Sequence, residues 1–219
     1  MVRLPAKGWF KKLSETTRAE IEESGIYRSY SARETLFLQS KPLTEYYFVM
    51  EGLVSVYQQN TDGKKWVASL FSSDDFFPHV GLLTDAYVYP ASAETVSNST
   101  LFVLPRKKAL IAFDTIPELQ NQLTCFLADK SQELMNRFSD SIFSSASDRY
   151  LTFLRRLALK TGKCQPDGRF VIVLGMTSQD MAEYIGVAPE TISRIMHHLL
   201  SAHLVEKVGK KKLLIKMED

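Results

Sequence analysis

Two charged residues near the C-terminus have the types and the spacing to form directional hydrogen bonds from one face of a helix. Glu190 and Arg194 are four positions apart, so in a helix they would project from one face. A carboxylate can accept a hydrogen bond from cytosine N4, and a guanidinium can donate two to guanine O6 and N7. Ser193 and His197 are polar residues of the same predicted face. The pattern predicts a helix that contacts base edges in the major groove.

The neighbouring residues predict the two helices that would position this face. Thr177 is a suitable cap for the first helix, with Asp180 three residues further on. Gly186 permits a left-handed turn, and Pro189 suits the first turn of the second helix. The apolar residues predicted to lie on the buried side are Met181, Ala182, Ile185, Ile192, Ile195, Met196 and Leu199. This arrangement is typical of a helix-turn-helix whose second helix enters the major groove.

A lysine-rich hairpin is predicted directly after these helices. Residues 204–208 and 213–217 are strand candidates, and they flank one glycine and three lysines in residues 209–212. Lysines at such a tip are typical of a wing that contacts phosphates. The residues predicted to contact DNA are Thr177, Ser178, Gln179, Pro189, Glu190, Thr191, Ser193, Arg194, His197, Lys210, Lys211 and Lys212.

The distribution of charge favours a polyanionic partner for the C-terminal part. Residues 147–219 carry 12 Lys and Arg against 8 Asp and Glu, a net charge of +4. Residues 1–146 carry 15 against 17, a net charge of −2. This asymmetry indicates nucleic acid as the partner of the basic part, with a merely solvated basic tail as the alternative.

Residues 31–105 are predicted to form an antiparallel barrel or roll of about seven or eight strands. Runs of β-branched and aromatic residues alternate there with turn residues. Residues 46–58 are predicted to form one long strand, in which Gly52 marks a bulge or a close approach of backbone. Asp62 and Gly63 predict a hairpin with a type I′ turn, which needs positive φ at both central residues.

A long helix is predicted from Pro117 to about Ser144, because proline is favourable at its start and apolar residues then recur every three or four positions. Its length of roughly 40 Å exceeds what a small barrel needs, so part of its apolar stripe is predicted to form a dimer seam. Packing along its own barrel is the alternative. The predicted seam residues are Leu119, Leu123, Phe126, Leu127, Lys130, Leu134 and Phe138. Residues 144–147 are expected to form a hinge, and Asp148 to cap the next helix, residues 149–160.

The composition argues against several classes of function. The two cysteines, Cys125 and Cys164, lack metal-ligand spacing and cannot supply the four thiolates of an iron–sulfur cluster. Three of the four histidines lie beyond residue 196, so a multi-histidine metal centre cannot form around His79. No nucleophile elbow, phosphate-binding loop or zinc-protease motif occurs. We therefore expect no enzyme, no metal and no cofactor, and the lack of a long apolar run or signal sequence predicts a cytoplasmic protein without a membrane span.

The chain as a whole resembles the cyclic-AMP receptor protein / fumarate-nitrate reductase regulator (CRP/FNR) family of bacterial transcription factors. The likeness rests on residues 48–54 (Phe-Val-Met-Glu-Gly-Leu-Val), residues 75–77 (Asp-Phe-Phe), the long helix and residues 189–194 (Pro-Glu-Thr-Ile-Ser-Arg). The resemblance implies an α+β fold with a cyclic-nucleotide-binding-like antiparallel β-roll, a long dimerisation helix and a winged helix-turn-helix. These three parts correspond to residues 1–116, 117–146 and 147–219.

The resemblance also implies a partner and a DNA site. Family members are homodimers that bind double-stranded DNA and act with RNA polymerase. Their residues matching Glu190 and Arg194 read the central bases of each half-site. Members with Ser at the position of Ser193, and an apolar residue at that of Pro189, tend to favour TTGA half-sites. The implied target is a palindrome near TTGA-N6-TCAA.

The same resemblance implies that cyclic AMP is not the effector. Members that bind cyclic nucleotides carry a Glu for the ribose, Arg-Ser for the phosphate and Thr-Ser on the long helix for the base. A gap-free comparison places His79 at the Glu, Tyr89 and Pro90 at the Arg-Ser, and Leu134 and Met135 at the Thr-Ser. A cyclic phosphate without a cation would be buried and uncompensated, which is costly.

Several alternatives stay open for the sensor region. The candidate effector pocket consists of Phe76, Phe77, His79, Tyr87, Tyr89, Leu134 and Met135. Its apolar, aromatic character suits a hydrophobic small molecule, or a pocket filled by its own side chains. His79 is also competent as a haem ligand, and Cys125 as a redox-sensing thiol.

For the C-terminal part of the chain, a winged helix that binds protein instead of DNA is a further alternative.

Overall fold

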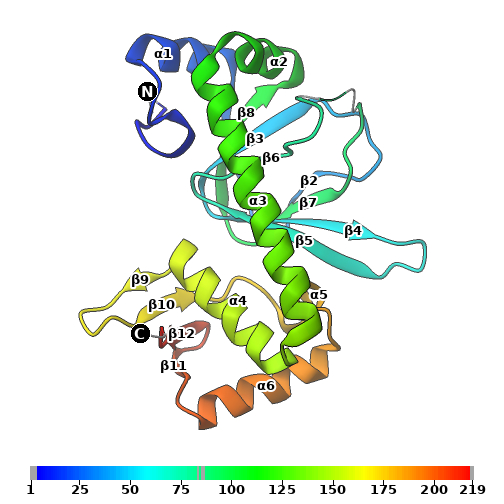
Figure 1. Cartoon of the computed structure of the whole chain (residues 1–219), viewed down its shortest axis with the longest axis vertical. Helices are drawn as coiled ribbons and strands as arrows, with labels where there is room; N and C mark the ends of the chain where they lie inside the picture. The colour runs from blue at the N-terminus through cyan, green and yellow to red at the C-terminus, as the bar shows by residue number, and fades with distance from the viewer. Residues whose placement is uncertain (1–3, 83, 85–86, 218–219) are drawn as a thin grey trace. The chain divides into compact units, whose positions relative to one another are not determined.

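The computed structural model describes residues 4–82, 84 and 87–217 (Figure 1). The chain forms two compact units of mixed helix and antiparallel sheet, in agreement with the predicted α+β class. The first unit lies within Met1–Lys64 and Ala68–Glu133, and the second within Lys65–Val67 and Leu134–Asp219. None of the helices in the described ranges has the length and apolar character of a membrane span.

The first unit is a β-roll. Its strands are β1 (Ile26–Tyr30), β2 (Thr35–Phe37), β3 (Glu45–Glu51), β4 (Leu53–Gln59), β5 (Lys65–Ser72), β6 (Phe76–Phe77), β7 (Ser92–Thr95) and β8 (Ser99–Pro105). They form two antiparallel four-stranded sheets, with the strand orders β1-β8-β3-β6 and β2-β7-β4-β5. The predicted roll and its number of strands are confirmed.

Gly52 passes the chain from one sheet to the other, between β3 and β4. Its φ is +100°, and a Cβ at this position would lie 2.2 Å from Ser99 Oγ, so only glycine fits. The predicted close approach is therefore confirmed. The prediction of a single long strand over residues 46–58 is wrong. The stretch forms two strands in different sheets, since β3 pairs with β6 and β8 whereas β4 pairs with β7.

The β4–β5 hairpin turns over residues 60–64. The Asn60 amide donates to the Lys64 carbonyl at 3.1 Å, and the Gly63 amide donates to the Asn60 carbonyl at 3.0 Å. Of Asp62 and Gly63, only Gly63 has a positive φ, at +80°. The predicted hairpin is confirmed, but the type I′ turn is wrong, since that turn needs positive φ at both central residues.

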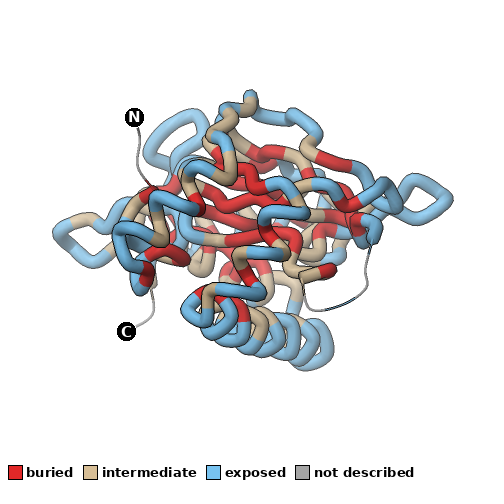
Figure 2. Tube along the Cα trace, turned by 90° about the horizontal axis from the view of Figure 1, so that it is seen from above, coloured by how far each residue is buried: buried red, intermediate tan, exposed pale blue. Residues whose placement is uncertain are grey.

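Three helical segments of the first unit complete its core, and sequence patterns did not predict them. They are η1 (Gly8–Phe10), α1 (Glu15–Ser24) and α2 (Arg106–Thr115). Trp9 of η1 packs on Phe76 at 4.9 Å between ring centroids, and on Phe113 of α2 at 6.0 Å. Figure 2 shows the buried residues in red, concentrated along the interior strands, with the hairpin ends exposed.

The second unit is a winged helix-turn-helix, as predicted. Its elements are α4 (Ala146–Thr161), β9 (Lys163–Cys164), β10 (Phe170–Val173), α5 (Ser178–Ile185), α6 (Pro189–Ser201), β11 (Val205–Gly209) and β12 (Lys212–Ile215). The strands form one sheet of order β11-β12-β10-β9. The long helix α3 (Pro117–Phe143) has residues in both units, and its predicted bounds are confirmed.

The cap of α4 differs from the prediction by three residues. Ser145, and not Asp148, is the N-cap residue. The Ser145 hydroxyl accepts from the Asp148 amide at 3.2 Å, and Asp148 accepts in return from the Ser145 amide at 3.3 Å. The two residues thus form a capping box. Asp148 takes the third helical position, where its negative charge interacts favourably with the positive end of the helix dipole.

Candidate nucleic-acid interface

The N-terminus of α5 is held by the predicted capping pair. The Thr177 hydroxyl accepts from the Asp180 amide at 3.2 Å, while the Asp180 carboxylate accepts from the Thr177 amide at 2.6 Å. Two backbone donors that the helix cannot satisfy are thereby paired. Thr177, Ser178 and Gln179 are all exposed at this end, where backbone and hydroxyl donors suit a phosphate.

The turn between α5 and α6 takes the predicted left-handed conformation. Gly186 has φ +80° and ψ +41°, and its amide donates to the Ala182 carbonyl at 2.8 Å. Pro189 then occupies the first turn of α6, where its fixed φ suits the helix and its missing N–H costs nothing. Gly186 thus ends α5 with a left-handed residue, and Pro189 begins α6.

Helix α6 separates an apolar face from a polar one. Ile192, Ile195 and Leu199 are buried, as predicted. The opposite face carries the exposed side chains of Glu190, Ser193, Arg194, His197 and His198. Within the described residues, neither Glu190 nor Arg194 has an ion-pair partner. The two residues predicted to read bases are thus uncommitted and face solvent.

The interior of the unit fixes α5 against α4. Tyr150 of α4 is fully buried, and its hydroxyl donates to the sulfur of Met181 in α5 at 3.1 Å. Burial raises the pKa of the Tyr150 phenol well above its usual range, so the ring stays neutral. Phe153 packs on Tyr184 with 4.7 Å between ring centroids. These contacts hold α4 and α5 together through buried and partly buried side chains.

The wing is a short hairpin with its lysines exposed. Gly209 ends β11 and Lys212 begins β12, so Lys210 and Lys211 form the turn itself. The carbonyl of Lys211 accepts from the Leu174 amide at 2.8 Å, which ties the turn to the end of β10. Lys210, Lys211 and Lys212 are all exposed, as phosphate contacts require.

Sequence patterns missed Arg169, which braces the wing. Its guanidinium donates to Asp167 at 2.8 Å and to Glu206 of β11 at 2.9 Å. Hydrogen bonds from Arg169 lower the pKa of the Asp167 carboxyl. The guanidinium therefore joins the loop before β10 to the outer strand of the wing. The Asp167-Gly168 turn before it is the only sequence signal for this contact.

The residues predicted for the dimer seam fall into two groups along α3. Leu119 and Leu123 are buried in the core of the β-roll, and Phe126 and Leu127 are partly buried against it. Further along the helix, the side chains of Leu134 and Phe138 are 57% and 67% exposed. Exposed apolar residues continue beyond these with Ile142 and Phe143, which the predicted set did not include. Leu119 and Leu123 are thus covered within the β-roll itself, whereas the apolar residues further along α3 are exposed.

The residues predicted for the effector pocket do not line one cavity. Phe76, Phe77 and Tyr89 are buried, whereas Tyr87, Leu134 and Met135 are more than half exposed. Tyr87 lies under the Arg106 guanidinium, which is 5.2 Å from the ring centroid. Phe77 and His79 alone of the set line an apolar cavity of about 50 Å³.

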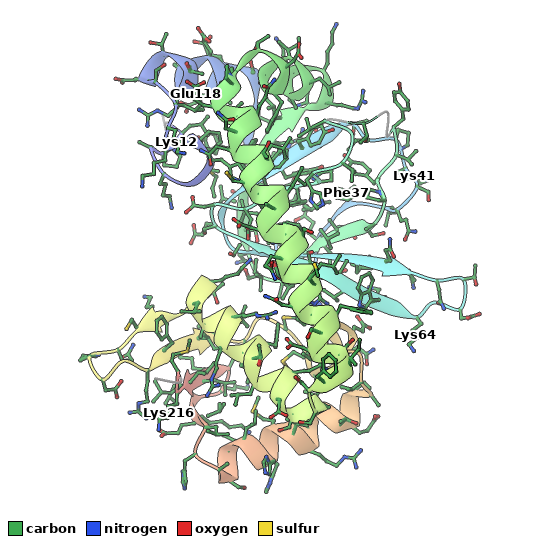
Figure 3. All side chains as sticks on the ribbon, viewed as in Figure 1. Lys12, Phe37, Lys41, Lys64, Glu118 and Lys216 are labelled. Atoms are coloured by element: carbon green, nitrogen blue, oxygen red, sulfur yellow. The ribbon has the colours of Figure 1, made fainter. Side chains whose placement is uncertain are left out.

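Tyr89 occupies the place predicted for a phosphate-binding arginine. Its ring and its hydroxyl both contact other residues of the β-roll. Its ring stacks on Phe37, labelled in Figure 3, with 3.8 Å between centroids and 8° between planes. Its hydroxyl accepts from the Glu45 amide at 3.1 Å and donates to the Glu45 carbonyl at 3.2 Å. Tyr89 thus forms part of an internal aromatic pair of the β-roll.

The cavity beside His79 does not fit haem. Sites that bury drug-sized ligands have volumes of roughly 300–1,000 Å³, several times the 50 Å³ found here. The walls are side chains of the packed core, among them Phe37, Phe71 and Phe77. The cavity therefore has no room for a porphyrin ring beside His79.

Comparison with known proteins matches both units. Residues 27–115 match the family described as "Cyclic nucleotide-binding domain", and residues 148–219 match the "Crp-like helix-turn-helix domain". The chain is 25% identical over 182 residues to the "cAMP-activated global transcriptional regulator CRP" of Pasteurella multocida, covering 83% of this chain and 86% of that protein.

Solved structures share the fold. The structure of FixK2 from Bradyrhizobium japonicum matches with a TM-score of 0.77 at 19% identity, covering 88% of this chain and 93% of that one. The c-di-GMP responsive global regulator CLP of Xanthomonas campestris matches with a TM-score of 0.74 at 19% identity, covering 94% and 100%.

A β-roll of the cyclic-nucleotide-binding type, joined to a winged helix-turn-helix with an uncommitted polar face, defines a DNA-binding transcription regulator. Both domain matches and the similar regulators agree on this class. The chain belongs to the cyclic-AMP receptor protein / fumarate-nitrate reductase regulator family. This family consists of transcription regulators and not of enzymes.

Proposed function

We propose that the chain is a homodimeric, sequence-specific regulator that recognises a palindrome near TTGA-N6-TCAA. The observation that carries this proposal is the outer face of α6, where Glu190, Ser193, Arg194 and His197 are exposed over a buried apolar face. Arg194 donates to a guanine, and Glu190 accepts from the amino group of a cytosine. Thr177, Ser178, Gln179 and the wing lysines bind phosphates and set the register.

The exposed stretch of α3 supports the homodimer. Leu134, Met135, Phe138, Ile142 and Phe143 expose apolar side chains along one stretch of helix. Such a surface is unfavourable in water and favours a partner. A second copy is the partner that also explains a palindromic site, because the symmetry of the operator mirrors the two-fold symmetry of the protein.

The packed interior of the β-roll supports independence from cyclic AMP. Tyr89 and Phe37 stack at the predicted position of the phosphate-binding cation, and the neighbouring cavity of about 50 Å³ is too small for a nucleotide. The Pasteurella relative is described as activated by cyclic AMP. This chain is proposed to differ from it in the sensor and to share its mode of DNA binding.

The cellular setting follows from the family. We place the regulator in the cytoplasm, where it meets the chromosome and RNA polymerase. Cys125 and Cys164 are exposed and free.

Fluorescence anisotropy tests this function. The purified protein, without added ligand, is titrated onto a labelled TTGA-N6-TCAA duplex and a scrambled duplex at one salt concentration. Selective binding to the palindrome supports the proposal. Equal binding to both duplexes contradicts the proposed half-site, and failure to bind either at low salt favours a winged helix that contacts protein.

A further inference from the structure

A guanidinium near the end of α3 lies over two aromatic rings of the second unit. The Cζ atom of Arg137 is 4.2 Å from the ring centroid of Tyr184 in α5 and 6.0 Å from that of Trp66 in β5. Residues 65–67 belong to the second unit, as does the part of α3 from Leu134 onward. The planar guanidinium group is well suited to stacking on a ring face. Arg137 therefore brings together three segments that are distant in the sequence.

The same guanidinium donates hydrogen bonds to two backbone carbonyls. Its Nη2 lies 3.2 Å from the Val67 oxygen and 3.4 Å from the Tyr184 oxygen. Tyr184 is the last residue but one of α5, and the last four carbonyls of a helix have no partner within the helix. The helix dipole also favours a cation at this end. Arg137 thus acts as a cap on the C-terminus of α5, supplied from α3.

The capped end of α5 is where the chain turns toward α6. Gly186 follows two residues after Tyr184, and α6 begins at Pro189. A Cβ at Gly186 would have no atom of the described residues within 4 Å, so that side of the turn is open. The Tyr184 ring, in contrast, is contacted by Phe153 of α4, at 4.7 Å between centroids, and by Arg137 of α3. The direction in which α6 leaves the turn should therefore depend on the contacts of Tyr184.

We propose that Arg137 determines which spacing between two half-sites the homodimer accepts. It lies on the same turn of α3 as Leu134 and Phe138, whose exposed side chains are predicted for the dimer seam. By holding the end of α5 against α3, Arg137 fixes the angle between the helix that pairs the protomers and the helix that reads bases. This angle sets the distance between the two recognition helices, and the half-site spacing follows from that distance. The inference rests on the proposed homodimer and its palindromic site.

The contacts of this side chain require the chemistry of arginine. Two carbonyls and a ring face approach one group, and a guanidinium has donors along its edge as well as a flat face. A lysine ammonium can pair with a carbonyl but has no plane to stack on Tyr184. Glutamine has no charge to offer the helix terminus. Substitution of Arg137 by lysine should therefore weaken the contact, and substitution by glutamine should weaken it further.

Hydrogen exchange of the full-length protein without DNA tests the cap itself. The Gly186 and Val187 amides both donate to the Ala182 carbonyl, at 2.8 and 3.1 Å, so their exchange reports on the end of α5. In Arg137→Gln these amides should exchange several-fold faster than in the wild type, because a helix end that loses its cap opens more often. Unchanged exchange overturns the proposal, whatever the result with DNA.

Arg155→Gln is the matched control for this experiment. Arg155 of α4 also donates to a backbone carbonyl, that of Lys216 at 3.2 Å, but this carbonyl is remote in sequence from α5. The exchange of residues 186 and 187 should be the same in Arg155→Gln as in the wild type. Equal acceleration in both variants would show a general loosening of the unit and would overturn the proposal.

Fluorescence anisotropy on palindromes with spacers of five, six and seven base pairs tests the spacing. The wild type should prefer six by about tenfold or more, since a changed spacer misplaces one half-site. Arg137→Gln should reduce this preference several-fold, while its affinity for a duplex with a single TTGA half-site should stay within about twofold of the wild type. A merely structural role would lower the affinity for all duplexes alike and leave the preference unchanged, and this result overturns the proposal.

A second variant and the wild type keep the possible failures apart. Arg137→Lys is used if Arg137→Gln does not fold, and it should show a smaller loss of the spacing preference; an unchanged preference overturns the proposal. If the wild type selects the palindrome and Arg137→Gln keeps its spacing preference, only this inference fails. If the wild type does not distinguish the palindrome from a scrambled duplex, the proposed function fails and the spacing role fails with it.

Discussion

Polar side chains are exposed on the outer face of α6, whereas in the interior of the β-roll they are enclosed by aromatic rings. On α6, Glu190 and Arg194 are exposed, and in the described part of the chain they have no ion-pair partner. Inside the β-roll, the Lys130 ammonium lies over the rings of Phe71 and Phe126, and His79 packs edge-on against Phe126. One region presents its chemistry to a large external partner, and the other encloses it.

This difference has an energetic meaning. Exposed side chains on a rigid support can be exchanged at little cost to folding, so they are free to determine specificity. The enclosed groups are part of a packed aromatic core, where each change is felt by the neighbouring side chains. Changes on α6 should therefore alter binding without altering stability, and changes in the β-roll should do the reverse.

The largest expected effect is on the core. Phe76→Ala removes a fully buried ring that packs on Trp9 and Phe48, and should lower the free energy of unfolding by about 3–5 kcal/mol. Ile111→Ala, at a half-exposed position of α2 in the same unit, should change it by less than about 0.5 kcal/mol. Urea denaturation followed by fluorescence measures both, and similar losses in the two variants would break the comparison.

The next effect is on base recognition. Arg194→Ala should lower the affinity for the palindrome by about 1–3 kcal/mol, because it removes a bidentate contact to guanine. The affinity for a scrambled duplex, measured by the same anisotropy assay, should hardly change, and neither should the midpoint of urea unfolding. An equal loss on both duplexes would assign Arg194 to the phosphates instead of the bases.

A smaller effect is expected at the wing. Lys211→Ala should weaken binding to all duplexes and reduce the slope of log affinity against log salt by up to about one, since one phosphate contact is lost. Lys64→Ala removes an exposed lysine outside the predicted interface and should leave the slope unchanged. A loss confined to one half-site base would contradict the phosphate role of Lys211.

The smallest expected effect is the contribution of His79 to the pH dependence of the unfolding free energy. Its pKa is lowered in the folded state, chiefly by burial, so the unfolded chain binds the proton more tightly. The contribution of His79 to stability is therefore complete above the unfolded pKa of about 6.5, and it is lost as the pH falls through the lower folded value. His79→Gln should make the unfolding free energy less dependent on pH between about 7.5 and 5.5. Urea denaturation at both pH values measures this, and an unchanged dependence would contradict the account.

The helix-turn-helix could be predicted because its signals are local. The cap at Thr177, the glycine at 186, the proline at 189 and the apolar period of α6 lie within one short stretch. Each acts on its own turn of backbone, whatever the rest of the chain does. The α2 helix escaped prediction for the opposite reason. Pro105 precedes it without a capping side chain, and its first turn has basic residues where acidic ones are expected.

The interior of the β-roll could not be predicted, because its contacts join distant parts of the chain. Lys130 has the spacing of the apolar stripe on α3 and is therefore predicted from the sequence to lie in the seam. The fold instead brings its ammonium group over the rings of Phe71 and Phe126. Leu119 and Leu123 share that spacing and are buried in the same core. The spacing of apolar residues identifies one face of a helix. Only the tertiary structure determines which side chains cover each turn of that face.

The most direct test of the central claim is the anisotropy of a labelled TTGA-N6-TCAA duplex, titrated with protein in the absence and presence of cyclic AMP. The account predicts selective binding over the scrambled duplex without any nucleotide, and the same affinity when cyclic AMP is added. Binding that appears only after cyclic AMP is added would contradict it, because the β-roll would then admit the ligand that its packed interior is proposed to exclude.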